Sequence, residues 1–208
     1  MSRFSFGCLR LAALLAAAAM VTTAWAGPPK KEAAAEAKSA AAKAGDEEEK
    51  LEPYQCGKVQ RLHTLGGVFL ASQPAKEDFT HAKEGGIKTV LNLREKDEMD
   101  WDEGELVKSL GMEYVNVPFK SPSTLTDEVF DKTRKLFGDK EKRPLLVHCA
   151  SANRVGAVWL AHRVLDGGKT YDEALKEAKT VGLKLPAYEE KAKDYIARMQ
   201  KKGAAKKE

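Results

Sequence analysis

The chain has 208 residues, of which 43% are hydrophobic and 32% charged, a composition that suits one soluble domain of ordinary size with some polar, poorly packed sequence. Its formal net charge of +4 falls to +2 if residues 1–26 are removed, because that segment contains Arg3 and Arg10 and no acidic residue. So balanced a charge does not suggest nucleic acid or a membrane surface as a partner.

Residues 1–26 have the pattern of an export signal. Arg3 and Arg10 precede an apolar run from Leu11 to Val21 and give it a positively charged start. Ala24-Trp25-Ala26 provides the small residues that a signal peptidase needs. The alternative is a membrane anchor, but the run is shorter than the roughly 20 residues that span a bilayer. We therefore expect cleavage, no membrane span afterwards, and an exported protein that is periplasmic or secreted.

The composition then changes twice along the chain. Residues 27–52 consist almost wholly of Pro, Lys, Ala, Glu, Gly and Asp, which cannot bury enough apolar surface to offset the entropy of ordering. This low-complexity segment is predicted to be a tether. One domain is expected over residues 53–200, followed by a frayed basic tail over residues 201–208.

Strand and helix patterns alternate within this domain. In chain order they predict a strand at 68–71, a helix at 76–84, a strand at 87–93, a helix at 101–110, a strand at 114–117, a helix at 126–137, a strand at 144–148 and a helix at 153–165. Thr170 and Glu173 form a capping box for another helix, and Pro186 begins the last one. The alternation predicts an α/β domain with a mostly parallel sheet, in which Gly156 lets the following helix approach the sheet closely.

The segment from His148 to Arg154, here called the Cys149 loop, follows the apolar strand at 144–148. Ligands of such sheets bind beyond the carboxyl ends of the strands, and free backbone N–H groups and the helix dipole favour an anion there. Arg154 adds a permanent charge and a planar fork that matches two phosphate oxygens. The same field favours the thiolate of Cys149, which could attack the central atom of a bound oxyanion.

The role of His148 in this loop is expected to be positional, through a hydrogen bond to the backbone, rather than that of a base. The alternative for the whole segment is a buried structural cysteine beside a surface arginine. After loss of Cys8 with the leader, Cys56 and Cys149 could also form a disulfide in an oxidising compartment, which would disable the nucleophile. The sequence leaves that question open.

Leu146 to Arg154 resembles the signature of protein tyrosine and dual-specificity phosphatases, and is most similar to a bacterial branch found alone, fused to beta-lactamase-like hydrolases or joined to NAD kinases. Three further stretches of the chain support the resemblance, at 71–74, 86–94 and 111–118. It covers about residues 60–165. It implies a dual-specificity-phosphatase-like domain of three layers, with a central mostly parallel sheet flanked by helices.

The resemblance also implies the chemistry. Cys149 would form a phosphocysteine while Arg154 and the amides of a phosphate-binding loop hold the phosphoryl oxygens; the loop residues are Ala150, Ser151, Ala152 and Asn153. The substrate would be a phosphorylated protein, with phosphotyrosine as one target, or a small phosphoester. We expect neither a cofactor nor a metal ion.

The sequence departs from the phosphatase pattern at three places. Four residues separate Cys149 from Arg154 instead of five, Val155 replaces a serine or threonine, and no acidic residue lies near Lys120, where the family places its general acid. Candidate acids elsewhere are Asp97, Glu98, Asp127 and Glu128. The short loop is shared by the bacterial branch and also resembles that of rhodanese sulfurtransferases.

Two alternatives to a phosphatase therefore stay open. One is a rhodanese-like sulfurtransferase that carries a persulfide on Cys149, and the other is a module that binds phosphate or phosphopeptide without turnover. Arg94 ends a strand beside the Cys149 loop, so it is a candidate for binding a second anionic group or for an ion pair with Glu95 or Asp97. Gln73 is a weaker candidate of the first kind.

Overall fold

The structure is a computed structural model, and it describes residues 50–205. The predicted signal segment 1–26 and almost all of the predicted tether lie outside the described residues. The strands are β1 (Glu52–Tyr54), β2 (Leu62–Leu65), β3 (Val68–Ala71), β4 (Thr89–Asn92), β5 (Glu113–Asn116) and β6 (Leu145–His148). The α-helices are α2 (Lys76–Glu84), α3 (Glu103–Ser109), α4 (Asp127–Gly138), α5 (Asn153–Leu165), α6 (Tyr171–Val181) and α7 (Pro186–Ala204), with short 3-10 helices η1 (Lys96–Glu98) and η2 (Lys140–Lys142).

The strands form one six-stranded sheet in the order β1-β2-β3-β6-β4-β5. β1, β2 and β3 pair antiparallel, whereas β3, β6, β4 and β5 run parallel to one another. β6 is central and all four of its residues are buried, as its apolar sequence predicts. The sheet is thus mostly parallel, as predicted, with an antiparallel hairpin added at one edge.

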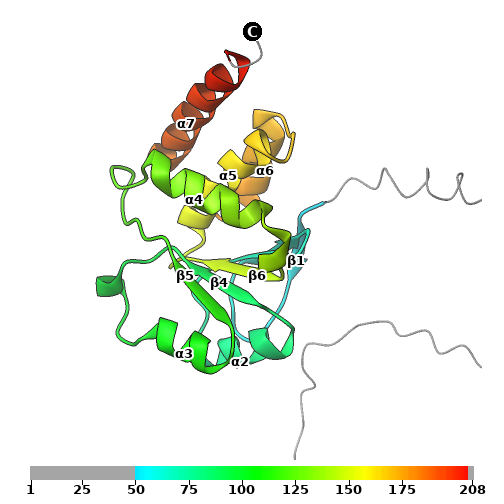
Figure 1. Cartoon of the computed structure of the whole chain (residues 1–208), viewed down its shortest axis with the longest axis vertical. Coiled ribbons are helices and arrows are strands. Elements are labelled where there is room, and N and C mark those ends of the chain that lie inside the picture. Colours follow the sequence, from blue (N-terminus) through cyan, green and yellow to red (C-terminus); the bar gives the residue numbers. More distant parts are fainter. Residues whose placement is uncertain (1–49, 206–208) are drawn as a thin grey trace, which may run out of the picture. The chain divides into compact units, whose positions relative to one another are not determined.

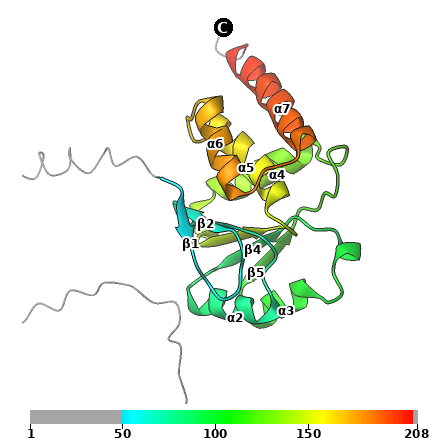
Figure 2. The same cartoon turned by 180° about the vertical axis from the view of Figure 1, so that it is seen from behind.

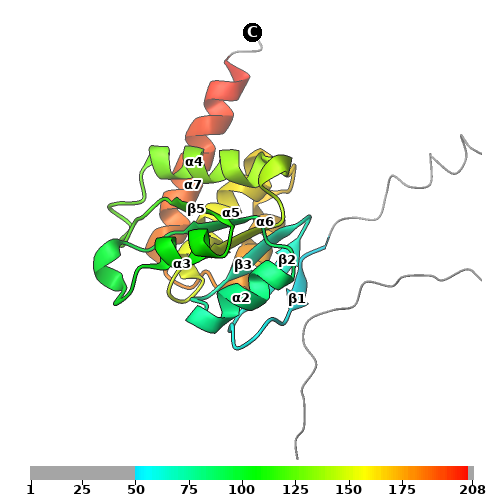
Figure 3. The same cartoon turned by 60° about the horizontal axis from the view of Figure 1, so that its bottom comes forward.

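Helices cover both faces of this sheet, which gives three layers (Figures 1 and 2). Helices α2 and α3 lie on one face, and α4, α5, α6 and α7 lie on the other. Each face has its own core: Phe79, Val90 and Val107 belong to the smaller one, and Leu91, Phe137 and Trp159 to the larger. In Figure 3 the bottom of Figure 1 is turned toward the reader, and α2 and α3 lie in front of the sheet. Within residues 50–205 no helix is long and apolar enough to cross a membrane.

Most predicted elements are present within one or two residues of their predicted bounds, and the strand at 68–71 and the helices at 76–84 and 153–165 coincide with β3, α2 and α5. The capping box at Thr170 is also present, with the side chain of Glu173 accepting from the Thr170 N–H. Helix α3 begins later than predicted because Asp102 caps it by accepting from the N–H of Glu105.

Three elements differ from the prediction: β1, β2 and the end of α7. β1 begins at Glu52, inside the segment predicted as a tether, and β2 was not predicted; both strands are short and gain stability by pairing rather than by their own pattern. Helix α7 continues to Ala204, beyond residue 200 and into the predicted tail, because lysine and alanine are good helix formers.

The glycine at 156 serves a different contact from the one predicted. A β-carbon there would lie 2.8 Å from the carbonyl oxygen of Ala178 and from two atoms of Leu183. Gly156 therefore allows α5 to pack against the end of α6 and the turn that follows it, not against the sheet. This close approach brings the α6–α7 turn beside the Cys149 loop.

Replacing Gly156 by alanine should lower the free energy of unfolding by about 1–3 kcal/mol, the usual range for overpacking a filled interior. Chemical denaturation of the full chain measures this. Gly203→Ala is the matched control, since no atom lies within 4 Å of its would-be β-carbon, and it should leave the unfolding free energy equal or slightly higher. Equal stability of Gly156→Ala and the native chain would contradict the packing account.

Candidate active site

The parallel strands bring four loops together at their carboxyl ends. In the register of the sheet, Ala71 and Asn92 both lie opposite His148, and Asn116 lies opposite Asn92. The segments that follow these four residues therefore leave the sheet side by side. They comprise the Cys149 loop, the β3–α2 connection, the segment with η1, and the segment that holds Lys120.

Neighbouring segments bind two carbonyls of the Cys149 loop, and its backbone N–H groups stay unused within the described part of the chain. The N–H of Gln73 donates to the carbonyl of Ala150 at 3.3 Å, and Nη1 of Arg61 donates to the carbonyl of Ser151 at 2.9 Å. No described group accepts from the N–H groups of residues 150–154. These amides directly follow the buried Cys149, which is 1% exposed, and they are available for an oxyanion.

Two loop residues, Ala152 and Asn153, shape the turn. Ala152 has a φ of 65°, a left-handed conformation that is uncommon for a residue other than glycine. The side chain of Asn153 accepts from the N–H groups of Lys184 at 2.8 Å and Leu185 at 3.3 Å, which ties the loop to the α6–α7 turn. Oδ1 of Asn153 is therefore used within the protein, and a contribution of Asn153 to phosphate binding stays a prediction.

Arg154 lies in the first turn of α5, and its guanidinium is held on two sides. Its Nη1 and Nη2 donate to Oε2 and Oε1 of Glu98 at 2.7 Å each, and Nη1 also donates to the carbonyls of Phe119 at 2.7 Å and Leu93 at 3.2 Å. The edge formed by Nε and Nη2 has no acceptor on Nε among the described residues. That edge carries two parallel N–H groups, the arrangement that binds two oxygens of a phosphate.

Electrostatic interactions keep both Arg154 and Glu98 charged. The hydrogen bond from Arg154 lowers the pKa of Glu98 below its ordinary value of 4.5, against the opposing effect of burial. Burial disfavours the charged guanidinium, but Glu98 and the nearby Cys149 raise the pKa of Arg154. Glu98 therefore holds the arginine as a carboxylate, and it is not a proton donor at neutral pH.

His148 takes part in a buried chain of hydrogen bonds rather than bonding to the backbone as predicted. Its Nε2 lies 2.8 Å from Oε1 of Glu103, and both side chains are fully buried. Oε2 of Glu103 accepts from Gln73 at 2.8 Å, and Oε1 of Gln73 accepts from Arg94 at 2.6 Å. These hydrogen bonds connect the strand that precedes Cys149 to helix α3 and to the β3–α2 connection.

The predicted ion pair of Arg94 was wrong, whereas a role for Arg94 or Gln73 in binding a second anion stays a prediction. Arg94 makes no ion pair with Glu95 or Asp97; its Nη1 donates to Gln73 and its Nη2 to the carbonyl of Glu98. The side chain of Gln73 donates to Glu103 and to the carbonyl of Pro74 and accepts from Arg94, and the residue also lines a groove beside Ala150 and Ser151. The two residues support η1 and the Cys149 loop.

The remaining candidate acids are engaged elsewhere. Asp127 pairs with Arg198, whose hydrogen bond lowers its pKa, and Glu128 pairs with Lys132, which has the same effect. Asp97 accepts from Nζ of Lys120 at 2.8 Å, and both side chains are exposed. The place where the phosphatase pattern has an acid is therefore occupied by a lysine bound to a carboxylate.

The cysteines lie apart. Cys149 belongs to the larger core, and Cys56 packs against the smaller core on the opposite face of the sheet, so no disulfide joins them. In residues 50–205 no group of three or more His, Cys, Asp or Glu side chains is arranged to hold a metal ion.

The sequence matches a known protein family. Residues 62–194, more than half of the chain, match the sequence model of the family described as DSP-PTPase phosphatase fused to NAD+ kinase. The chain therefore belongs to this family, and it is a tyrosine and dual-specificity phosphatase-like hydrolase. No curated protein matches the chain.

Several solved structures share the fold. A DUF442 protein of Shewanella putrefaciens is 20% identical with a TM-score of 0.59, over 68% of this chain and 94% of that one. TpbA of P. aeruginosa is 18% identical with a TM-score of 0.55, over 71% and 88%. The core catalytic domain of the PP-IP phosphatase SIW14 of S. cerevisiae is 16% identical with a TM-score of 0.58, over 74% and 96%.

Substituting Glu98 by glutamine should lower the free energy of unfolding by about 1.5–3 kcal/mol, the range for a hydrogen bond to a charged group. Because the pKa of Glu98 is lowered in the folded chain, its stabilising contribution is complete above pH 4.5 and is lost as the pH falls through that lowered pKa. Denaturation of both chains between pH 7 and pH 3 should therefore show a difference that shrinks in acid.

Glu128→Gln is the control for this experiment, since it removes an exposed pair on α4 and should leave stability nearly unchanged. A stability difference for Glu98→Gln that is independent of pH would contradict the ion pair.

Proposed function

We propose that this member of the phosphatase family hydrolyses phosphoesters through a phosphocysteine on Cys149. The observation that supports this most is how Arg154 is held: Glu98 fixes one edge of the guanidinium, while neither Nε nor the loop amides have a described acceptor. Donors held in advance in this way stabilise the charge of a phosphoryl group as it is transferred. The family is a phosphatase family, and nothing in the comparisons favours the sulfurtransferase.

The reaction has two steps in this account. The Cys149 thiolate attacks phosphorus, a sulfur–phosphorus bond forms, and the bond to the ester oxygen breaks with its electron pair going to the leaving group. Water then attacks the same phosphorus, the sulfur–phosphorus bond breaks, and inorganic phosphate leaves with the thiolate restored. Arg154 and the N–H groups of residues 150–154 hold the three non-bridging oxygens throughout.

Two residues limit the rate. Lys120 stands where an acid would protonate the leaving oxygen, so the leaving group must depart as an anion or take its proton from water. Val155 is fully buried and has no hydroxyl to assist the departure of the Cys149 sulfur in the second step. We therefore assign a slow enzyme that prefers good leaving groups such as phenolic oxygens, and phosphotyrosine has such an oxygen.

The setting that we propose is outside the cytoplasm. The basic start, apolar run and Ala24-Trp25-Ala26 site of residues 1–26 support export to the periplasm or beyond. For the substrate, a variant of the structurally similar TpbA has been crystallised with pTyr. A phosphorylated protein or small phosphoester in that compartment is the proposed partner.

Changing Cys149 to serine should lower kcat/KM for p-nitrophenyl phosphate by at least about a thousandfold, because the weaker nucleophile replaces the thiolate. Arg154→Lys should lower it by about a hundredfold or more, since lysine cannot provide two parallel donors. Arg198→Lys on α7 is the matched control and should retain activity. Hydrolysis that survives Cys149→Ser would reject the proposed function.

The leaving-group dependence tests the role of Lys120 and Asp97. In a series of aryl and alkyl phosphates, kcat/KM should fall steeply as the leaving group becomes more basic, and Asp97→Asn should change each rate by less than about threefold. A general acid would contribute about 100- to 10,000-fold. A loss on Asp97→Asn that is large for alkyl esters and small for nitrophenyl esters would instead identify Asp97 as the acid.

A further inference from the structure

The connection between β1 and β2 borders the Cys149 loop in an unusual backbone conformation. Within residues 50–205, two residues other than glycine have a positive φ: Ala152 in the loop, at 65°, and Arg61 in this connection, at 52°. A left-handed arginine is unfavourable and persists where its surroundings enforce it, which happens most often at functional sites. The contacts of the connection show what enforces it here.

The connection is fixed against the segment that joins β3 to α2. The carbonyl of Gln60 accepts from the N–H of Ser72 at 3.3 Å and from the Ser72 hydroxyl, and the N–H of Lys58 donates to Oδ1 of Asp78 at 3.0 Å. A β-carbon on Gly57 would lie 1.9 Å from that same Asp78 oxygen, so the close approach requires glycine. Lys58 and Arg61 are thereby held on a rigid turn.

These two cations are not neutralised by the described part of the chain. Arg61 donates through Nη1 to the carbonyl of Ser151, and neither Arg61 nor Lys58 forms an ion pair with a described carboxylate. Of the other arginines in residues 50–205, Arg134, Arg154, Arg163 and Arg198 have carboxylate partners. Arg94 and Arg143 have none, but each uses both of its Nη atoms on protein oxygens, whereas the side chain of Arg61 makes one hydrogen bond to the described residues. The remaining N–H groups of Arg61 are left for an external acceptor.

A groove of about 400 Å³ lies between these elements and is here called the Arg61 groove. Its lining residues come from three segments and are Lys58, Gln60, Arg61, Ser72, Gln73, Ala75, Asp78, Ala150 and Ser151. The last two belong to the Cys149 loop, so the groove adjoins the phosphate site. Its one carboxylate, Asp78, is buried and accepts from the N–H groups of Lys58 and Ala75.

We propose that the Arg61 groove binds a second oxyanion of the substrate, a carboxylate or a phosphate carried next to the scissile phosphoester. Arg61 provides a planar donor edge, Lys58 a mobile charge, and the shared wall at Ala150 and Ser151 places the second group beside the first. This inference rests on the proposed phosphatase function and adds a substrate preference. Two sources fit the chemistry: an acidic side chain that flanks a phosphorylated residue, and a second phosphate on a small molecule.

Binding to a Cys149→Ser chain tests the groove independently of turnover. Calorimetry compares two pairs of ligands: phosphotyrosine peptides with glutamate or glutamine flanking the phosphorylated residue, and a small bisphosphate with the corresponding monophosphate. The member of at least one pair that carries the second anionic group should bind about threefold to tenfold more tightly, and the preference should weaken with salt. The pair that shows it identifies the source.

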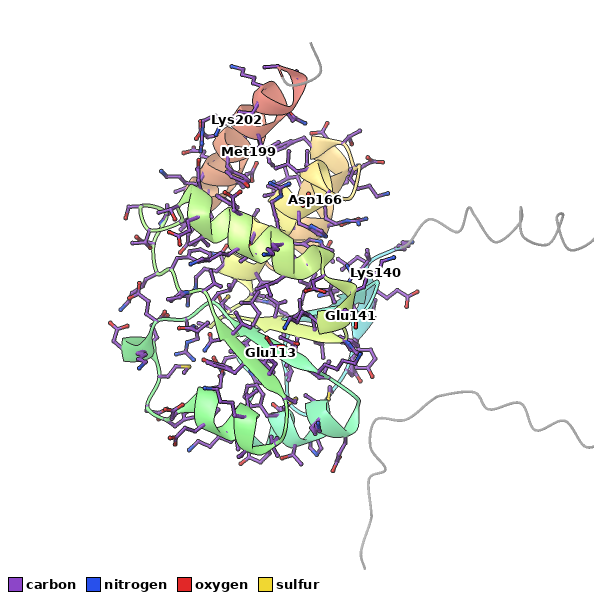
Figure 4. All side chains as sticks on the ribbon, viewed as in Figure 1. Glu113, Lys140, Glu141, Asp166, Met199 and Lys202 are labelled. Carbon is purple, nitrogen blue, oxygen red and sulfur yellow. The ribbon has the colours of Figure 1, made fainter. Side chains whose placement is uncertain are left out.

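Charge-removing variants in the same background assign the preference to residues. Lys58→Gln is decisive, since its side chain has no hydrogen bond or ion pair with the described residues; Arg61→Gln also frees the carbonyl of Ser151. Each should remove most of the preference. Lys140→Gln makes the same charge change on η2, before the amino end of β6, and should retain it (Figure 4).

Absence of any preference, or a preference that Lys58→Gln leaves intact, would overturn the proposal. Hydrolysis of p-nitrophenyl phosphate by the native enzyme is measured separately. If that hydrolysis is absent, the phosphatase function fails, while the binding comparison still decides whether the groove recognises a second oxyanion.

Discussion

The candidate active site depends first on how the guanidinium of Arg154 is held. Its charge is buried, which is costly unless partners compensate it, and Glu98 with the carbonyls of Leu93 and Phe119 provides that compensation. The same contacts fix which edge of the guanidinium remains for a ligand. Substrate then meets donors that are already oriented, so little reorganisation is needed as charge moves onto the phosphoryl oxygens.

The rest of the site follows from neighbours that constrain the Cys149 loop from outside. Gln73 and Arg61 bind its carbonyls, and the side chain of Asn153 anchors it to the α6–α7 turn. These carbonyls are engaged, whereas the loop amides have no acceptor among the described residues. Beneath the loop, the buried pair of His148 and Glu103 connects it to α3, so the site is supported by elements from both faces of the sheet.

The sequence contains the parts of this site that are local. A buried strand, a short turn and an arginine at a helix start are contiguous, and periodicity alone predicts β6 and α5 around them. The partners of these residues are not local. Glu98 and Glu103 look like ordinary solvated acids near a helix start, and nothing nearby in the sequence indicates that Arg154 and His148, about 50 residues later, will bind them. Pairing in the tertiary structure decides these roles, and it also places Arg94 against Gln73 and the carbonyl of Glu98 instead of in an ion pair.

The proposed mechanism requires that the phosphoryl group is transferred to the sulfur of Cys149 before water releases it. Because Val155 provides no hydroxyl for the second step, the intermediate should accumulate long enough to be trapped. Full-length enzyme is mixed with an aryl phosphate, quenched in acid within the first turnovers, and digested for mass spectrometry. The account predicts a phosphate on the peptide that contains Cys149, formed with a burst of phenol. Steady phosphate release with Cys149 unmodified at every time point would contradict it.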